Sequence, residues 1–218
     1  KEFSLYLNFN DSDTNVILGE EFELVHGIPF FEAEEQGIRY EAGPQTFLQV
    51  NENVRGKLYK DALKTVCEEG DEVVIDAYSG GGLLTAMLAK KAKRVYGIEL
   101  EEEASKCADS LKEKNGLTNV TNICGYVEKE LPAILEKEKG ENLRLILDPP
   151  RAGIARSVLF ALLESDIAQL TLISCNPATL ARDLGILSGR LIEQEGELVK
   201  NPAYAGVADG ETLAGYYA

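Results

Sequence analysis

Cys175 stands in a sequence context that suits a nucleophile. It follows the apolar run Leu170–Ser174, which predicts a strand, and Pro177 comes two positions later, where proline favours the first turn of a helix. A helix N-terminus stabilises negative charge and therefore the thiolate, which is the form of cysteine that attacks carbon. We therefore expect Cys175 to act as a covalent nucleophile.

Methylation at C5 of a uracil is a reaction that needs such a thiolate. C5 is too weak a nucleophile to attack a sulfonium methyl group, but addition of a thiolate to C6 makes C5 enolate-like. C5 can then take up the methyl group, and a base must remove the C5 proton before the thiolate can leave. The other cysteines, Cys67, Cys107 and Cys124, are expected to be small buried hydrophobic residues, because they form neither a CxxC pair nor a disulfide framework.

A glycine-rich turn predicts a ligand that the backbone approaches closely. Asp76-Ala-Tyr-Ser-Gly-Gly-Gly follows an apolar strand, and its glycines are consecutive, which excludes the GxGxxG dinucleotide fingerprint. Glu99 ends the next predicted strand, where a carboxylate can accept hydrogen bonds from both ribose hydroxyls. The pattern favours an adenosine ligand without a pyrophosphate over the alternative, a tight turn and a solvated glutamate.

Another predicted strand ends at Asp148 and is followed by Pro149-Pro150-Arg151. The paired prolines fix a rigid turn that cannot continue as a helix. Methyltransferases that act on exocyclic amines often place an aromatic residue after such prolines, so Arg151 argues against methylation of an amine. His26 is the only histidine, which excludes histidine triads and multi-histidine metal sites, and no metal site is predicted.

The elements that must position these residues form two regions that meet near residue 52. Before it, short β-prone runs predict an antiparallel meander; they are Phe3–Phe9, Thr14–Leu18, Phe22–Val25, Gly37–Glu41 and Phe47–Val50. After it, helices alternate with apolar strands, which is typical of a doubly wound α/β sheet. The predicted strands are Val73–Asp76, Arg94–Glu99, Val120–Cys124, Leu143–Asp148 and Leu170–Ser174. The predicted helices include Leu83–Lys91, Glu102–Lys114, a solvated helix within Glu128–Glu141, and one whose single face is lined by Val54, Leu58, Ala62 and Val66.

The composition points away from membranes and gives little help with nucleic acid. The chain has 218 residues and a net charge of -15, and residues 1–52 carry -9 of that charge. Phosphate contacts need Lys and Arg, so an RNA substrate would have to be held largely by something outside this chain. The sequence has no run of eighteen apolar residues and no signal-peptide pattern, so we expect a cytoplasmic protein without membrane contact.

Four motifs together resemble the bacterial RNA uridine-C5 methyltransferase family, over about residues 5–184. They are FLQVN (Phe47–Asn51), DAYSGGG (Asp76–Gly82), DPPRAG (Asp148–Gly153) and SCNPATLARDL (Ser174–Leu184). The resemblance is nearest to enzymes that modify 23S ribosomal RNA, with tRNA uridine methyltransferases as a sister group. It implies an α/β fold, namely the Rossmann-like doubly wound sheet of class I methyltransferases, preceded by a small antiparallel β region.

The resemblance also implies roles for individual residues. S-adenosyl-L-methionine would be contacted by Gln49, Tyr78, Glu99 and Asp148, and Cys175 would attack the base of an RNA substrate, 23S rRNA being favoured over tRNA. Residues 1–52 would be the β-rich part of a central RNA-binding region, and residues 53–218 the methyltransferase domain without its C-terminal end.

The chain departs from the family pattern in several places. Ser79 is a mild change from the Cys or similarly small residue that the family usually has there, and Tyr126 stands where an Asp commonly contacts adenine. The C-terminal segment whose glutamate removes the C5 proton, the oligonucleotide-binding module and the iron–sulfur cysteines are not found in these 218 residues. We therefore expect a fragment cut at both ends, with Thr212–Tyr217 as a last strand.

Two further functions stay open from the sequence. One is a catalytically incomplete RNA-binding or assembly module that keeps the cofactor fold, which the acidic composition favours. The other is a small-molecule methyltransferase, which would have no use for the SCNPATL motif. Binding of the cofactor and a covalent adduct with RNA distinguish the three functions.

Overall fold

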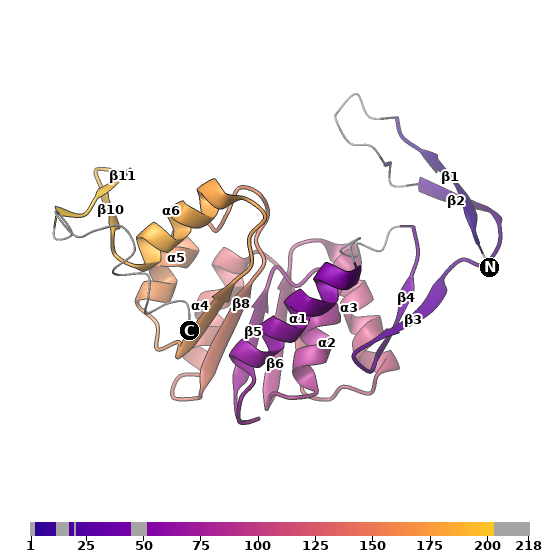
Figure 1. The fold of residues 1–218 in the computed structure, drawn as a ribbon, viewed down its shortest axis with the longest axis horizontal. Coiled ribbons are helices and arrows are strands. Elements are labelled where there is room, and N and C mark those ends of the chain that lie inside the picture. Colours follow the sequence, from indigo (N-terminus) through magenta and orange to yellow (C-terminus); the bar gives the residue numbers. More distant parts are fainter. Residues whose placement is uncertain (1–2, 12–17, 20, 45–51, 203–218) are drawn as a thin grey trace.

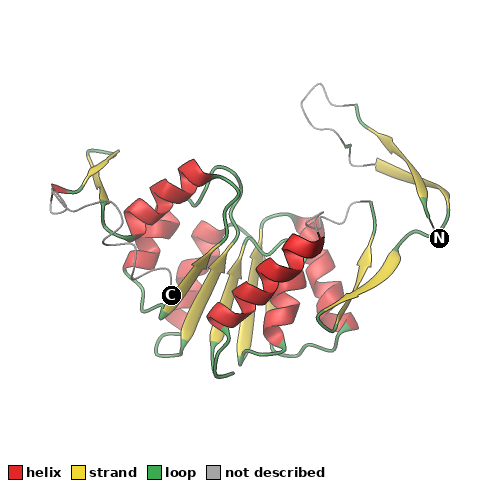
Figure 2. Cartoon of the chain, in the orientation of Figure 1, coloured by secondary structure: helices red, strands yellow, loops and turns green. Residues whose placement is uncertain are grey.

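The computed structural model describes residues 3–11, 18–19, 21–44 and 52–202. Its centre is a parallel sheet (Figure 2). The sheet has five strands in the order β7-β6-β5-β8-β9. The strands are β5 (Val73–Ala77), β6 (Arg94–Glu99), β7 (Val120–Cys124), β8 (Leu143–Leu147) and β9 (Gln169–Leu172). The order reverses between β5 and β8, and in such sheets ligands bind beyond the carboxyl ends of the strands at that point.

Helices cover both faces of this sheet, because its strands are apolar on both sides (Figure 1). Successive residues of one strand face opposite ways: Val74 packs in the cluster that contains α1 and α2, whereas Val73 and Ile75 pack in the cluster that contains α4 and α5. The helices are α1 (Glu52–Val66), α2 (Leu83–Ala89), α3 (Glu102–Lys114), α4 (Val127–Lys137), α5 (Arg156–Leu163) and α6 (Pro177–Leu187).

In the described part of the N-terminal region, the strands form two separate hairpins and not one continuous meander as predicted. The strands are β1 (Leu5–Phe9), β2 (Glu21–His26), β3 (Phe31–Glu35) and β4 (Ile38–Ala42), paired antiparallel as β1–β2 and β3–β4. Figure 1 shows β1–β2 projecting from the body. The predicted strands Thr14–Leu18, Phe47–Val50 and Thr212–Tyr217 lie largely or wholly outside the described residues.

The hairpin β3–β4 packs against the α/β part. Ile38 is fully buried and Tyr40 nearly so in the core cluster that contains α1 and α2. The side chain of Asn115, at the end of α3, accepts a hydrogen bond from the backbone N–H of Arg39 and donates one to its carbonyl. The proposed boundary at residue 52 therefore separates two regions that share one core.

Two details of the helices were not expected from the sequence. In α1, Val54 is exposed, and the buried face begins instead with Arg55, whose guanidinium bonds to the carboxylate of Glu35 at 2.7 Å. In α4 and its exit loop, Glu138 is buried rather than solvated, because its carboxylate accepts hydrogen bonds from Arg94 and Tyr96. In both cases a charged residue is buried with a partner of distant sequence position, which helical spacing alone cannot reveal.

A third hairpin follows α6 and consists of β10 (Leu191–Gln194) and β11 (Glu197–Lys200). Within the described part of the chain, no helix has the length and apolarity to cross a membrane. The same residues contain no group of three or more His, Cys, Asp or Glu side chains placed to hold a metal ion.

Candidate active site

The glycine-rich loop links β5 to α2 at the carboxyl edge of the sheet. Tyr78 has a φ of 65°, which is unusual for a residue with a side chain, and Gly82 has a φ of 79°. A Cβ on Gly82 would lie 2.6 Å from the Cβ of Ala108 in α3, so glycine is needed there for close packing. Backbone strain of the kind seen at Tyr78 concentrates at ligand sites.

Glu99 holds this loop in place. One of its carboxylate oxygens accepts a hydrogen bond from the backbone N–H of Gly80 at 2.8 Å, and the other accepts from that of Glu101 at 2.9 Å. Each carboxylate oxygen can accept more than one hydrogen bond. Glu99 therefore shapes the loop and can still accept hydrogen bonds from a ribose, as predicted.

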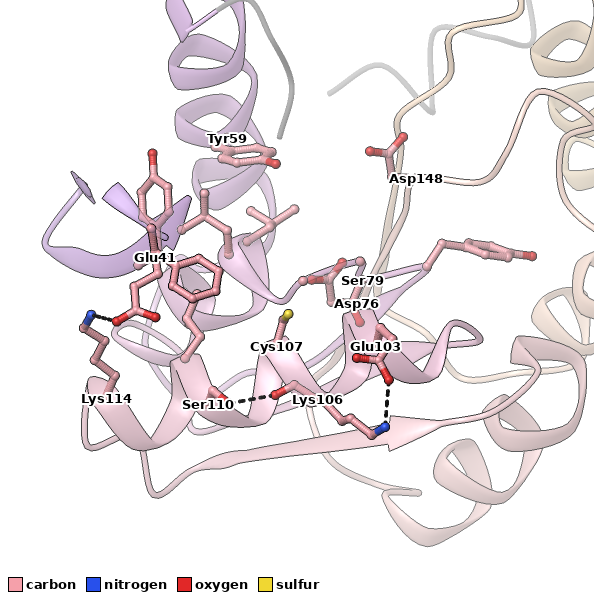
Figure 3. A pocket seen from close by; sticks show the side chains of 18 residues that line it. Glu41, Tyr59, Asp76, Ser79, Glu103, Lys106, Cys107, Ser110, Lys114 and Asp148 are labelled. Atoms are coloured by element: carbon pink, nitrogen blue, oxygen red, sulfur yellow. Dashed lines mark hydrogen bonds and ion pairs between the residues drawn. The ribbon is translucent and has the colours of Figure 1, made fainter. Parts of the chain in front are cut away.

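A cavity of about 320 Å³ lies beside the loop (Figure 3). Its walls come from the loop, α1, α3, β4 and the end of β8. The cavity brings together Tyr78 and Asp148, two of the four predicted cofactor residues, and adds Asp76. Glu99 reaches its border through the bond to Gly80, and Gln49 lies outside the described residues.

Two carboxylates of the cavity are held in an unfavourable environment. Asp76 is buried, and burial raises its pKa to about 7, against the hydrogen bond that Thr85 donates to it at 2.6 Å. The nearby charges of Asp148 and Glu99 raise the pKa of Asp76 as well. Burial also raises the pKa of Asp148. A cation in this cavity would be favoured by both groups.

Cys175 lies in the loop between β9 and α6, and its side chain is exposed. The predicted strand was too long, because β9 ends at Leu172. Pro177 begins α6 as predicted, and the side chain of Asn176 caps the helix by accepting a hydrogen bond from the N–H of Ala178. Cys175 does not line the 320 Å³ cavity.

Hydrogen bonds join the Cys175 loop to the proline loop after β8. The side-chain amide of Asn176 donates to the carbonyl of Arg151 at 3.0 Å. Asp183, buried in α6, accepts from the N–H of Ile154 at 3.0 Å, and Arg182 donates to the carbonyl of Ile154 at 3.1 Å. Because β8 and β9 are neighbouring parallel strands, Asp148 and Cys175 follow adjacent strand ends. The structure thus fixes the two loops to each other.

Several side chains of the cavity were not predicted as site residues. Tyr59 in α1 and Tyr40 in β4 line it, and so does Cys107 in α3. Cys107 and Cys124 are exposed, so the prediction that they are buried is wrong, while Cys67 is partly buried against the core. Tyr59 gives no signal in the sequence except its position one helical turn before Ala62 and Leu63, on the buried face of α1.

A family model described as tRNA (Uracil-5-)-methyltransferase matches residues 28–192. The chain belongs to this family. The family consists of S-adenosylmethionine-dependent RNA methyltransferases, so the resemblance seen in the four motifs is confirmed. The match begins just before β3 and therefore includes the hairpin β3–β4 and the whole parallel sheet.

Two bacterial relatives of this chain are uncharacterized RNA methyltransferases. That of Clostridium acetobutylicum is 39% identical over 181 residues, which are 83% of this chain and 39% of the relative. That of Fusobacterium nucleatum is 34% identical over 185 residues, which are 85% of this chain and 40% of the relative. The chain thus spans about two fifths of the length of these curated relatives.

Solved structures confirm the class I methyltransferase fold. The crystal structure of the Pyrococcus abyssi tRNA (uracil-54, C5)-methyltransferase in complex with S-adenosyl-L-homocysteine is 28% identical, with a TM-score of 0.69 over 84% of this chain and 44% of that one. An S-adenosylmethionine-dependent methyltransferase of Agrobacterium tumefaciens shares the fold with a TM-score of 0.59 at 14% identity, over 77% of this chain and 61% of that one.

Proposed function

We propose that the protein transfers a methyl group from S-adenosyl-L-methionine to C5 of a uridine in RNA, with Cys175 as the covalent nucleophile. The observation that carries this proposal is the pair of strand ends β8 and β9, which hold Asp148 at the cavity and Cys175 in the adjoining loop. Membership of the uracil-5-methyltransferase family supports the reaction.

The cavity suits the proposed cofactor. S-adenosylmethionine supplies the methyl group on a sulfonium, and it carries an ammonium group as well. Asp76 and Asp148 are acidic groups whose charged forms are destabilised by burial, so a cationic ligand improves their environment. Glu99 is placed beside the glycine loop, where it can accept from the ribose. Tyr78 and Gln49 keep their predicted cofactor contacts as part of the proposal.

The exposed thiol of Cys175 can reach a base that has left its stack, because nothing in the described residues covers it. Its attack on C6 of the uracil forms the carbon–sulfur bond and moves the electron pair to C5 and O4. C5 then takes the methyl group, and loss of the C5 proton to a base releases the thiolate.

The proposed substrate is 23S ribosomal RNA, as the sequence motifs suggest, and the proposed place of the reaction is the cytoplasm. The solved relative from Pyrococcus abyssi acts on uracil 54 of tRNA by its description, so tRNA is the competing substrate. Transfer of radioactive methyl groups to 23S rRNA and to tRNA, each lacking 5-methyluridine, compares the two. Methylation of tRNA alone would contradict the proposed substrate and leave the reaction intact.

A covalent adduct tests the nucleophile. In 5-fluorouridine RNA, fluorine replaces the C5 hydrogen and cannot leave as a proton, so the enzyme stays bound through C6. We expect a band shifted on denaturing gels that requires S-adenosylmethionine and disappears in Cys175→Ala. Cys124→Ala is the matched control, since Cys124 is also exposed but ends β7 at the opposite edge of the sheet. An adduct that persists in Cys175→Ala would exclude this mechanism. Cofactor binding without adduct or product would favour the non-catalytic RNA-binding module.

A further inference from the structure

Tyr59 presents an unused hydroxyl group to the cavity. The residue comes from α1 and lines the cavity together with Asp76 and Asp148. Figure 3 shows its ring lying across the cavity with the hydroxyl toward the side from which Asp148 enters. Within the described part of the chain this hydroxyl has no hydrogen-bond partner, although a partly buried phenol usually has one.

The two carboxylates opposite are also open to a ligand. Thr85 occupies one oxygen of Asp76, and no described residue donates a hydrogen bond to the side chain of Asp148. Burial raises the pKa of Tyr59 to about 12, and the charges of Asp76 and Asp148 raise it as well, so the phenol keeps its proton at neutral pH. The three side chains therefore combine one neutral hydroxyl with two acids.

The lysines that line the cavity, Lys106 and Lys114, do not neutralise these acids, because each is paired with two glutamates. Lys106 contacts Glu102 at 2.9 Å and Glu103 at 2.8 Å. Lys114 contacts Glu41 at 2.8 Å and Glu32 at 3.2 Å. Neither lysine therefore supplies a positive charge to Asp76 or Asp148, and a cationic ligand would supply it.

We propose that Tyr59 is a cofactor-binding residue, which together with Asp76 and Asp148 holds the α-ammonium group of the amino-acid end of S-adenosylmethionine. This assignment rests on the proposed function. A primary ammonium has three N–H donors, which two carboxylates and a phenol oxygen can accept, while the phenol gives its own proton to a carboxylate. A sulfonium has no N–H donor, so the hydroxyl distinguishes the ammonium end of the cofactor from its methyl-bearing centre.

The experiment measures affinity by calorimetry for two probes. S-adenosylhomocysteine has the ammonium, and 5′-deoxy-5′-methylthioadenosine lacks the whole amino-acid end. Tyr59→Phe should weaken S-adenosylhomocysteine about tenfold, the effect of losing one hydrogen bond to a charged group, and should leave methylthioadenosine within about twofold. Tyr40→Phe is the matched control: its ring lines the same cavity, but its hydroxyl accepts from Arg55 at 3.4 Å.

Each outcome decides a separate point. Equal losses for both probes in Tyr59→Phe would mean that the ring only packs, and unchanged affinity for S-adenosylhomocysteine would remove Tyr59 from the site. If the unmodified chain binds neither probe, the proposed function itself fails. A measurement without any variant completes the test: the unmodified chain should bind the desamino analogue of S-adenosylhomocysteine at least about tenfold more weakly than the parent compound. Equal binding of the two compounds would overturn the ammonium site.

Discussion

Asp76 carries an energetic cost that the fold tolerates at the end of β5. Its pKa of about 7 lies above the value of 3.8 expected for an exposed aspartate. Between these two values the folded protein binds more protons at this group than the unfolded chain does. The free energy of unfolding therefore falls as the pH rises from about 4 to 7, by the general linkage between proton binding and stability.

Asp76→Asn should remove this decrease in the free energy of unfolding with rising pH. Asparagine keeps an oxygen that can accept from Thr85 and has no charge to bury. We expect the free energy of unfolding at pH 8 to rise by on the order of 1–3 kcal/mol, and to change much less at pH 4, where the folded aspartate is protonated and the unfolded one is only partly ionised. Denaturant titrations at both pH values measure this. An equal gain in the free energy of unfolding at pH 4 would show that the charge of Asp76 is not its cause. Asp76→Asn should also bind S-adenosylhomocysteine less well than the unmodified chain.

At the scale of single residues, the sequence revealed those side chains that end a strand beside a conspicuous loop. Glu99, Asp148 and Cys175 could be found in this way, because the carboxyl ends of parallel strands gather at one edge. Tyr59 could not, since a tyrosine on the buried face of a helix has the same pattern whether it fills the core or faces a ligand. The open hydroxyl that separates the two is a property of the three-dimensional packing.

The proline loop after β8 and the helix α6 behave as one element. Gly153 has a φ of 81°, and a Cβ on it would lie 2.4 Å from a guanidinium nitrogen of Arg182 and 2.8 Å from an oxygen of Asp183. Both of these side chains bond to the backbone of Ile154. The spacing between the loop of Asp148 and the loop of Cys175 therefore depends on the absence of a side chain at residue 153.

Gly153→Ala tests this dependence, with Gly140→Ala as its matched control. Gly140 also has a positive φ, 88°, but no atom lies within 4 Å of its added Cβ. Gly140→Ala should lower the free energy of unfolding by about 1–2 kcal/mol through backbone strain alone. Gly153→Ala should lower it by about 1–3 kcal/mol more, because the added Cβ displaces the side chains of Arg182 and Asp183. At a temperature where both variants are folded, only Gly153→Ala should slow formation of the 5-fluorouridine adduct. Equal adduct rates in the two variants would show that the contacts of Arg182 and Asp183 with the proline loop do not affect catalysis.

At the scale of elements, the parallel strands were predicted almost to the residue. Strands buried on both faces are mostly apolar runs, as in Val73–Ala77 and Arg94–Glu99, and these give a strong pattern. The hairpin strand Phe31–Glu35 was missed, because its three glutamates read as solvated loop. The carboxylate of Glu35 is largely buried against Arg55, and that partner comes from a different element.

At the scale of the whole molecule, the two N-terminal hairpins differ in how they pack against the α/β part. The hairpin β1–β2 packs chiefly on itself. Among the described residues, the side chains of Ser4 and Tyr6 donate hydrogen bonds to the carbonyls of Ile28 and Pro29, in the segment that follows β2. The hairpin β3–β4 instead gives Ile38 to the core of the parallel sheet. Stability of the α/β part should therefore depend on the second hairpin and not on the first.

Two deletions measure this difference. Removal of residues 1–27 should change the melting temperature by no more than about 3 °C, which corresponds to under ~1 kcal/mol in a chain of this size. Removal of residues 1–44 takes away Ile38 and Tyr40 and should lower it by about 10 °C or more, or prevent folding. If both deletions have the same effect, the core does not extend to β3–β4.

The projecting hairpin also has a consequence for how copies of the chain meet in solution. Phe3, Leu5, Leu7 and Phe9 are each about half exposed or more, which gives β1 and the residues just before it an apolar side facing solvent. The net charge of -15 opposes contact between two such surfaces through mutual repulsion. Salt shortens the range of that repulsion from about 30 Å at 0.01 M to about 3 Å at 1 M. The chain should therefore be least inclined to associate in dilute buffer, and added sodium chloride should make it scatter more light, the reverse of the behaviour of proteins that salt keeps dispersed.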